Sequence, residues 1–347
     1  MLKEREDLFV CRQGPLWGTL SNMPRHVIHQ GLTDKGHAEI ENERRFLRLL
    51  EPTGYVPKVI DWNTEPDSLS IDGVMLPCLR VEDVGDNLVV TDEEEFRRHF
   101  IRMLWHFKKE GLIHGDLTGA NIRVVNNVPK VIDWKESRMA HENSPDKRKE
   151  GDIFHAFAFL ASLKDARRIG TRFFAMWKAI LDSESGHWFL NSPPRWYDPG
   201  TYRGYIAACA AAAGFKVTGT DINPGSIEES NYLWGGMGIR FVYGDSINMG
   251  RIKQGEFNVA SLLSVYPYML EAHGDIACHD YIEGLIDNTN IFFFETQLFG
   301  DGPGPEEFKT THDVEAWLYE RGANSVEAIL ESDVGRETTR TLWKVTK

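Results

Sequence analysis

Three polar side chains suited to phosphoryl transfer lie close together in the sequence, between residues 113 and 134. Asp116 could orient an attacking hydroxyl and accept its proton, while Asn121 and Asp133 could hold magnesium ions beside the phosphates. An aspartate next to a glycine is also a common turn residue, but the full pattern, with a hydrophobic strand before Asp133, is far more specific. The pattern therefore predicts transfer of a phosphoryl group to a hydroxyl.

This run resembles the catalytic loop of protein kinases, which has the form His-Arg-Asp, four residues and Asn, with a magnesium-binding Asp on a following strand. Here His114, Gly115 and Asp116 stand in the place of His-Arg-Asp. With a glycine at the second position, the loop resembles that of the kinase branch that contains aminoglycoside kinases, RIO kinases and Bud32-type kinases. The resemblance implies a two-lobed α+β domain that binds ATP and Mg²⁺ and uses Asn121 and Asp133 as metal ligands.

Kinase chemistry also needs a small lobe that covers the nucleotide. Residues 38–50 have apolar side chains at helical spacing, and the resemblance implies that Glu43 is the helix acid of the nucleotide site; a solvated surface acid is the alternative. The lysine that contacts the phosphates should lie on a strand at residues 25–31, where the chain has His29. Because a neutral imidazole cannot replace a fixed positive charge, a degenerate kinase that only binds its nucleotide is a second interpretation.

A second set of acids and glycines begins near residue 195, where strands and helices alternate. Asp198, Gly200 and Gly204 form the pattern Asp-x-Gly-x-x-x-Gly at the first strand-to-helix turn, where glycine allows a tight turn and close packing. Asp221 ends the next strand, at a spacing suited to ribose hydroxyls, and Asp245 ends the third. Alternating strands and helices imply a parallel sheet with its ligand at the carboxyl ends of the strands.

This second pattern resembles class I S-adenosylmethionine (SAM)-dependent methyltransferases, whereas a dinucleotide enzyme would have Gly-x-Gly-x-x-Gly. The resemblance implies that Asp198, Gly200, Gly204, Asp221 and Asp245 bind SAM, with Asp245 beside adenine. Any one of these acids could alternatively be a helix N-cap. Four nearby tyrosines could line the pocket or pack in the core: Tyr202, Tyr205, Tyr266 and Tyr268.

The composition limits the classes of protein that the chain could represent. With 347 residues, 41% hydrophobic and 26% charged, the sequence is typical of a globular protein of about two domains. The net charge of −13 disfavours a broad surface for nucleic acid or anionic membranes. No apolar run approaches membrane-spanning length, the charged N-terminus is unlike a signal peptide, and the four cysteines lie far apart. We therefore expect a cytoplasmic protein with reduced thiols.

Residues 273–280 contain two histidines, one cysteine and two aspartates, which could suggest a metal site. Their spacing fits no usual zinc pattern, so we expect a solvated loop.

The expected fold class is an α+β protein-kinase-like two-lobed domain followed by an α/β Rossmann-like class I methyltransferase domain. A segment rich in helix-breaking residues separates the two. The expected boundaries are 1–184 for the kinase-like domain (small lobe about 1–83, large lobe about 84–184), 185–194 for the linker and 195–347 for the methyltransferase-like domain.

This pairing resembles the chain-terminating kinase–methyltransferases of O-antigen synthesis, whose modules come in the opposite order. It implies a bifunctional transferase that uses ATP to phosphorylate a hydroxyl acceptor, such as a glycan or a small molecule, and SAM for methylation. The alternative is a SAM-dependent methyltransferase with a degenerate kinase-like domain that binds a nucleotide or a substrate. A third interpretation makes both halves partner-binding scaffolds. The sequence identifies neither the acceptor nor the oligomeric state.

Overall fold

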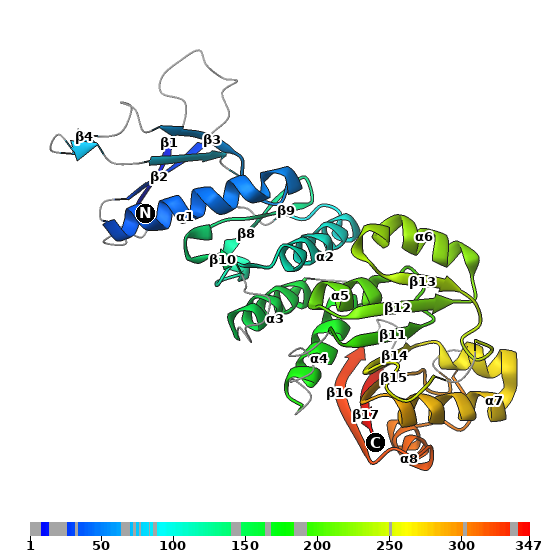
Figure 1. Ribbon diagram of the computed structural model, residues 1–347. Coiled ribbons are helices and arrows are strands. Elements are labelled where there is room, and N and C mark those ends of the chain that lie inside the picture. Colours follow the sequence, from blue (N-terminus) through cyan, green and yellow to red (C-terminus); the bar gives the residue numbers. More distant parts are fainter. Residues whose placement is uncertain are drawn as a thin grey trace. The chain divides into compact units, whose positions relative to one another are not determined.

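The computed structural model of the protein describes most of the chain. The predicted linker lies largely outside the described residues, which are 8–13, 26–31, 34–63, 70–71, 74–75, 78–82, 84–85, 89–139, 147–163, 168–183, 193–249, 252–300, 304–333 and 339–347. The chain divides into two compact units, Met1–Ala156 and Phe157–Lys347 (Figure 1).

The first unit begins with a four-stranded antiparallel sheet. Its strands lie in the order β1-β2-β6-β3, with bounds Leu8–Gln13, His26–Gly31, Cys78–Glu82 and Val59–Asn63. Two very short strands, β4 (Ser70–Ile71) and β5 (Val74–Met75), pair with each other. The sheet belongs to the part of the chain in which the sequence predicted a small lobe.

One long helix, α1 (Asp34–Leu50), contacts both β2 and a 3-10 turn, η3 (Trp134–Glu136). The helix begins four residues before the predicted start at residue 38. Its apolar side chains recur near helical spacing and are buried, as the sequence predicted: Ile40, Phe46, Leu47 and Leu50. A second short turn, η1 (Glu51–Thr53), follows the helix. The helix therefore connects the sheet with the segment that carries Asp133.

The rest of the first unit is built around α2 (Glu93–Lys109). The Asp92 carboxylate accepts a hydrogen bond from the amide of Glu95 and caps the helix. Acidic residues occupy the first turn and basic residues the last, which suits the helix dipole. Short strands follow: β7 (Leu112–Ile113), β8 (Ile122–Val125), β9 (Val128–Val131) and β10 (Arg138–Met139). The unit ends within a further helix, α3 (Lys147–Ser162), at Ala156.

The second unit contains a seven-stranded sheet in the order β13-β12-β11-β14-β15-β17-β16. The first five strands of this order are parallel, and β17 is antiparallel to both of its neighbours. The bounds are Arg195–Pro199 (β11), Lys216–Asp221 (β12), Arg240–Tyr243 (β13), Val259–Leu263 (β14), Ile291–Glu295 (β15), Ser325–Asp333 (β16) and Thr339–Thr346 (β17). This sheet confirms the predicted Rossmann-like α/β class.

Helices cover both faces of this sheet (Figure 1). A core cluster joins α7 (Tyr266–Asn288) and α8 (Thr311–Glu320) to one face, whereas α4 (Ile169–Leu181) and α5 (Tyr205–Ala213) pack on the other. Six of the nine residues of α5 are alanine, and these small side chains allow the helix to lie close to the strands. A fifth helix, α6 (Pro224–Trp234), packs on α5 through ring contacts.

Helix α4 contacts α5, β16 and β17 and lies in the second compact unit, which begins at Phe157. The expected domain boundaries, with a linker at 185–194, stay a prediction. The structure differs from one expectation about the second half of the chain. The expectation of a solvated loop at residues 273–280 was wrong, since this segment is part of helix α7. Gly274 has φ 72° and ψ 173° and kinks the helix there.

Candidate functional site

The catalytic-loop residues of the first unit are joined by hydrogen bonds. Asn121 is buried, and its Nδ2 donates to the Asp116 backbone oxygen at 2.8 Å and to Asp116 Oδ2 at 2.9 Å. Asp116 itself is exposed. Because both N–H groups of the Asn121 amide face Asp116, its Oδ1 is the atom left to accept a ligand, as a magnesium site requires.

A buried carboxylate supports this loop from within the unit. Asp152 accepts hydrogen bonds from the backbone amides of His114 at 2.7 Å, Gly115 at 3.0 Å and Leu117 at 3.2 Å. Asp152 lies inside α3, which starts at Lys147, so it does not cap that helix. Three amides on one carboxylate fix the backbone that leads to Asp116.

Asp133 is held in a backbone conformation that is uncommon for a residue with a side chain, at φ 67° and ψ 56°. The next residue, Trp134, is fully buried and donates its ring N–H to the Val131 oxygen at 2.9 Å. The preceding amide, that of Ile132, donates to the Asn121 oxygen at 3.0 Å. These contacts hold the segment carrying Asp133 beside the one carrying Asn121, in a conformation of the kind that functional sites impose.

The two small-lobe candidates have different outcomes. Glu43 on α1 is 3% exposed, which excludes the solvated surface acid considered from the sequence. His29 lies on β2, which pairs with β1 and β6, and its side chain is outside the described residues. Among the residues that the structure describes, no group of three or more His, Cys, Asp or Glu side chains is placed to hold a metal ion.

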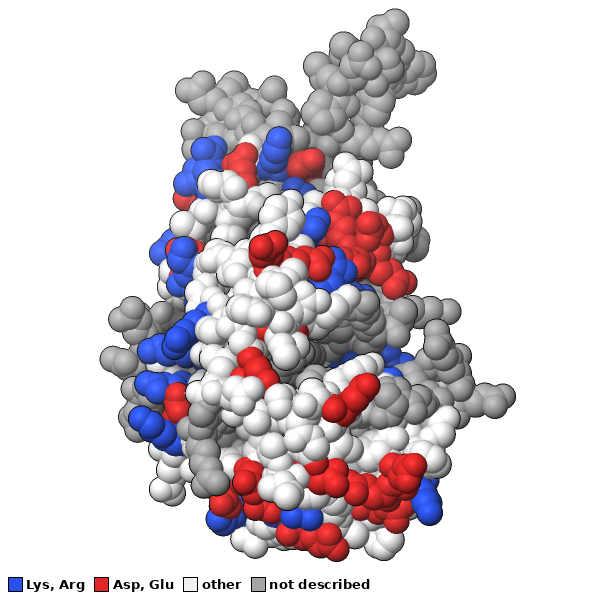
Figure 2. All heavy atoms as spheres, turned by 90° about the vertical axis from the view of Figure 1, so that its right-hand side faces the viewer, with Lys and Arg blue, Asp and Glu red and all other residues white. Residues whose placement is uncertain are grey.

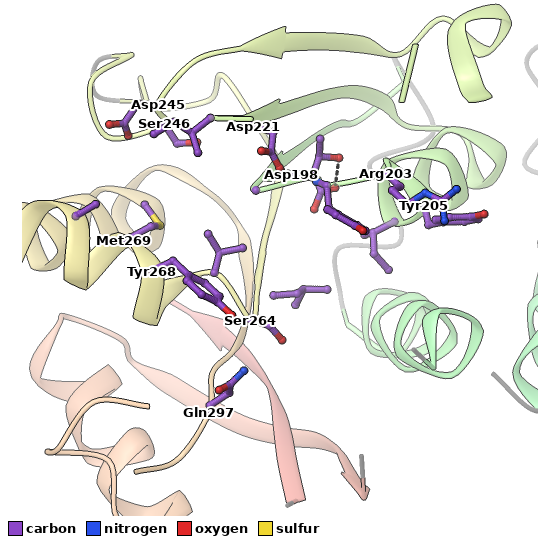
Figure 3. A pocket seen from close by; sticks show the side chains of 18 of the residues that line it. Asp198, Arg203, Tyr205, Asp221, Asp245, Ser246, Ser264, Tyr268, Met269 and Gln297 are labelled. Carbon is purple, nitrogen blue, oxygen red and sulfur yellow. Dashed lines mark hydrogen bonds between the residues drawn. The ribbon is translucent and has the colours of Figure 1, made fainter. Parts of the chain in front are cut away.

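In the second unit, the carboxyl ends of β11, β12, β13 and β14 open into a cavity of about 780 Å³ (Figure 3). From β11, the strands β12 and β13 follow on one side of the sheet and β14 and β15 on the other, so the strand order reverses between β11 and β14. Ligands of open α/β sheets bind at such a point. Every residue in the predicted SAM set lies here: Asp198, Gly200, Asp221 and Asp245 line the cavity, and Gly204 begins the adjoining helix α5.

Asp198 is buried beneath the first turn of this cavity. Its Oδ1 accepts a hydrogen bond from the Ser261 hydroxyl and its Oδ2 accepts one from the Thr201 hydroxyl, each at 2.7 Å. Burial raises the pKa of the Asp198 carboxyl to about 6, although both hydroxyls act to lower it and the charge of Asp221 raises it further. The geometry makes Asp198 a support for the turn.

The glycines of the turn are required by space as well as by backbone conformation. Gly200 has φ 69°, and a Cβ there would lie 2.4 Å from Val265 Cγ2. Gly204 has φ 70°, and a Cβ there would lie 2.7 Å from Phe241 Cζ. A side chain at either position would push the turn out of the floor of the cavity.

Asp221 and Asp245 both retain room to accept hydrogen bonds from a ligand. Asp221 accepts from the amides of Tyr202 at 2.9 Å and Asn223 at 2.8 Å, which uses two of about four acceptor positions on the carboxylate. Asp245 Oδ2 lies 2.8 Å from His273 Nε2 on α7 and accepts from Asn248 Nδ2 at 2.8 Å. Its Oδ1 accepts from the Ile247 amide at 3.1 Å. Both acids thus face the cavity with acceptor positions that a ligand could use.

The sequence did not predict the two arginines on the opposite wall of the cavity. Arg172 on α4 and Arg340 on β17 line it, and both lie near the buried carboxylate of Glu295, with N–O distances of 2.9 and 3.7 Å. Ser264 has φ 61°, accepts from Arg340 at 2.7 Å and donates to Glu295 at 2.5 Å. These four side chains come from separate segments, so no short spacing could reveal them.

The four predicted tyrosines divide between the two roles considered for them. Tyr202, Tyr205 and Tyr268 line the cavity, whereas Tyr266 is fully buried among the rings of Phe294, Phe308 and Trp317.

Comparison with known protein families gave a match in the first part of the chain. Residues 24–162 match the RIO domain. The match covers every residue predicted for the nucleotide site, from His29 and Glu43 to Asp116, Asn121 and Asp133. It confirms the kinase-like resemblance. A comparison with curated protein sequences gave no match.

Several solved structures are similar to about half of the chain. The bifunctional kinase–methyltransferase WbdD is 19% identical with a TM-score of 0.43, over 52% of this chain and 40% of WbdD. The N-terminal domain of EvdMO1, solved with SAH and D-fucose, is 11% identical with a TM-score of 0.39, over 53% of this chain and 84% of that domain. Thermoplasma acidophilum 1320 is 13% identical with a TM-score of 0.37, over 57% of this chain and 97% of that protein's chain. The chain thus spans about two fifths of the length of WbdD.

Acidic side chains form several groups on the lower part of the face in Figure 2, in keeping with the net charge of −13. None of the helices in the described residues has the length and apolar character needed to cross a membrane.

Proposed function

We propose that the protein is a bifunctional transferase with one activity in each unit. The RIO domain would transfer the γ-phosphoryl group of ATP to a hydroxyl of a small molecule or glycan. The hydrogen bonds that link Asn121 to Asp116, on a loop braced by Asp152, carry this proposal. They support a carboxylate kept at the acceptor and an amide oxygen kept for the metal.

In this reaction the acceptor oxygen forms a bond to the γ-phosphorus while the bond to the bridging oxygen of ADP breaks. Asp116 takes the hydroxyl proton. Asn121 Oδ1 and the Asp133 carboxylate would hold magnesium, which neutralises phosphate charge when bound. The protein's own contribution is mainly to position these groups.

The phosphoryl-transfer half is tested with Asp116→Asn, which keeps the shape of the side chain and removes its basicity. We expect MgATP binding to persist and phosphate transfer from ATP to fall by about 10²- to 10⁴-fold. The matched control is Glu93→Gln, which removes an exposed acid on α2. Equal transfer by wild type and Asp116→Asn would exclude this role. MgATP binding without transfer by the wild type would favour a degenerate, nucleotide-binding domain.

The second unit would bind SAM at the carboxyl ends of its parallel strands and transfer its methyl group. Asp221 would accept hydrogen bonds from the ribose hydroxyls, and Asp245 would border adenine. The support is the convergence of Asp198, Gly200, Asp221 and Asp245 on one cavity at the point where the strand order reverses.

The basic wall of the cavity supports an anionic oxygen as the methyl acceptor. Arg172 and Arg340 both line the cavity, each beside the carboxylate of Glu295, and their guanidinium groups could bind an anionic oxygen. An anionic oxygen needs no general base: its bond to the methyl carbon forms as the carbon–sulfur bond breaks, and the electron pair stays on sulfur. A phosphate made by the RIO domain would have this chemistry, and would place phosphorylation before methylation.

The methyl-transfer half is tested by calorimetry with SAM. We expect Asp221→Asn to weaken SAM binding by about 10- to 100-fold, since a hydrogen bond to a charged group is lost. Asp287→Asn, which changes an exposed acid paired with Lys347, is the control and should bind SAM as the wild type does. SAM affinity unchanged in Asp221→Asn would show that the cofactor does not lie against β12.

A further inference from the structure

A lysine is held against the predicted magnesium ligand of the RIO domain. Lys135 Nζ lies 2.8 Å from Asp133 Oδ1, and the lysine side chain is only 10% exposed while that of Asp133 is 36% exposed. Lysine side chains usually extend into water because burying the ammonium costs hydration and rotamer freedom. A shielded ammonium at this position is therefore a specific feature of the site.

The backbone of this lysine is fixed from two directions. The side-chain amide of Asn42 on α1 donates to the Lys135 oxygen at 2.9 Å and to the Ser137 oxygen at 2.7 Å. On the other side, the fully buried ring of Trp134 anchors the turn, 4.7 Å from the ring of His114. The same contacts therefore position both the Lys135 ammonium and Asp133.

The nucleotide site needs a positive charge, and the small-lobe strand that would be expected to supply it has no lysine. A triphosphate brings several negative charges to a site that already holds the carboxylates of Asp116 and Asp133. The strand that should provide the balancing lysine carries His29, which is neutral at pH 7 unless its environment stabilises the imidazolium. A lysine ammonium with three rotatable donors suits a phosphate oxygen.

We propose that Lys135 is the phosphate-binding lysine of this RIO domain and contacts the triphosphate of MgATP in place of the missing small-lobe lysine. The proposal rests on the proposed kinase function, because it assigns a residue of the same nucleotide site. In the ligand-free protein the ammonium is paired with Asp133. When MgATP binds, Asp133 turns to the metal and the ammonium to a phosphate oxygen, so each keeps a partner of opposite charge.

A simpler role for Lys135 makes the opposite prediction. If the ammonium only neutralised Asp133 until the metal arrived, it would compete with magnesium, and its removal would tighten MgATP binding. If it contacts phosphate, its removal weakens MgATP binding and leaves the adenosine part unaffected. The direction of the change therefore separates the two roles.

The test is calorimetry on the full chain with MgATP and, separately, adenosine. We expect Lys135→Met to weaken MgATP binding by about 10- to 100-fold and to change adenosine binding less than twofold. Lys135→Arg, which keeps the charge, should recover part of the loss. The control is Lys35→Met, which removes a lysine of the same kind from an exposed i,i+4 pair with Glu39 on α1, and it should bind both ligands normally.

The outcomes separate this proposal from the proposed kinase function. MgATP affinity that is unchanged or higher in Lys135→Met, or an equal loss of adenosine binding, would overturn the role of Lys135 even if the wild type transfers phosphate. Conversely, a Lys135-dependent affinity for MgATP without phosphate transfer would support Lys135 and contradict the kinase function. A wild type that binds no MgATP would overturn both.

Discussion

Asp198 carries a buried carboxyl group, and its burial disfavours the charged form. The protein keeps two hydroxyl donors on it, yet burial outweighs them and raises the pKa of the group from 3.8 to about 6. At pH 7, above this pKa, the carboxylate is mostly ionised. The hydrogen bonds that it accepts from Ser261 and Thr201 hold the turn around Gly200. The residue thus trades stability for the shape of the cavity floor.

This cost predicts a pH dependence of stability. Because the folded pKa is raised, the contribution of Asp198 to stability is fully present below about pH 4 and is lost as the pH rises through 6. The side chain of Asp198→Asn cannot ionise. The free energy of unfolding of this variant, minus that of the wild type, should therefore rise by up to about 3 kcal/mol between pH 4 and 7. Urea unfolding of both proteins at several pH values measures this difference, in which the other titrating groups cancel. A difference independent of pH would contradict the raised pKa.

The sequence could predict that two site residues lie together when both belong to one short segment. Asp116 and Asn121 are five positions apart, and the local chain brings them into contact. Arg340 and Ser264 are 76 positions apart, and only the completed sheet makes them neighbours. Local spacing therefore indicated the nucleotide loop and the acids at the strand ends, whereas the basic wall depends on tertiary packing.

At the scale of elements, the turn between β11 and α5 combines an unusual backbone conformation with a steric limit. We expect Gly200→Ala to destabilise the second unit by about 2–4 kcal/mol, because it adds both strain at positive φ and a clash with Val265. Gly238→Ala is the matched control, since Gly238 has φ 71° and open space around it. It should cost only the strain of positive φ, about 1 kcal/mol.

Thermal melts of both variants, together with SAM calorimetry, measure these effects. The control should bind SAM normally, whereas Gly200→Ala should lose affinity because the turn shifts at the cavity floor. Equal melting temperatures for the two variants would mean that the contact with Val265 relaxes at no cost.

The elements that were missed share a physical cause. Residues 273–280 carry polar groups that suggested a loop, yet they lie within α7, whose buried Cys278, Ile282 and Leu285 pack on the sheet. Tertiary burial of one helix face outweighed the local polar composition. The antiparallel pair β16 and β17 was also not foreseen, because nothing local shows that β17 inserts beside β15.

At the scale of the whole molecule, the position of α4 decides where the second unit begins. The ring of Phe173 lies 4.6 Å from that of Phe157 and 5.8 Å from that of Trp196 on β11, while Trp177 lies against Phe215. Phe173 and Trp196 are fully buried. Because α4 also carries Arg172 of the basic wall, the helix serves both the core and the cavity of the methyltransferase-like unit.

This packing predicts which fragment of the chain is an independent methyltransferase-like domain. A fragment of residues 157–347 should melt cooperatively and bind SAM. A fragment of residues 185–347, which follows the boundary expected from the sequence, lacks α4 and exposes the ring of Trp196 and part of α5. Burial of a large apolar side chain contributes about 1.5–3 kcal/mol, and α4 buries five such side chains, so its loss exceeds the margin of stability of a typical domain. Circular dichroism melts and SAM calorimetry of both fragments measure this. A shorter fragment that melts and binds SAM as the longer one does would show that α4 is not part of the methyltransferase-like domain.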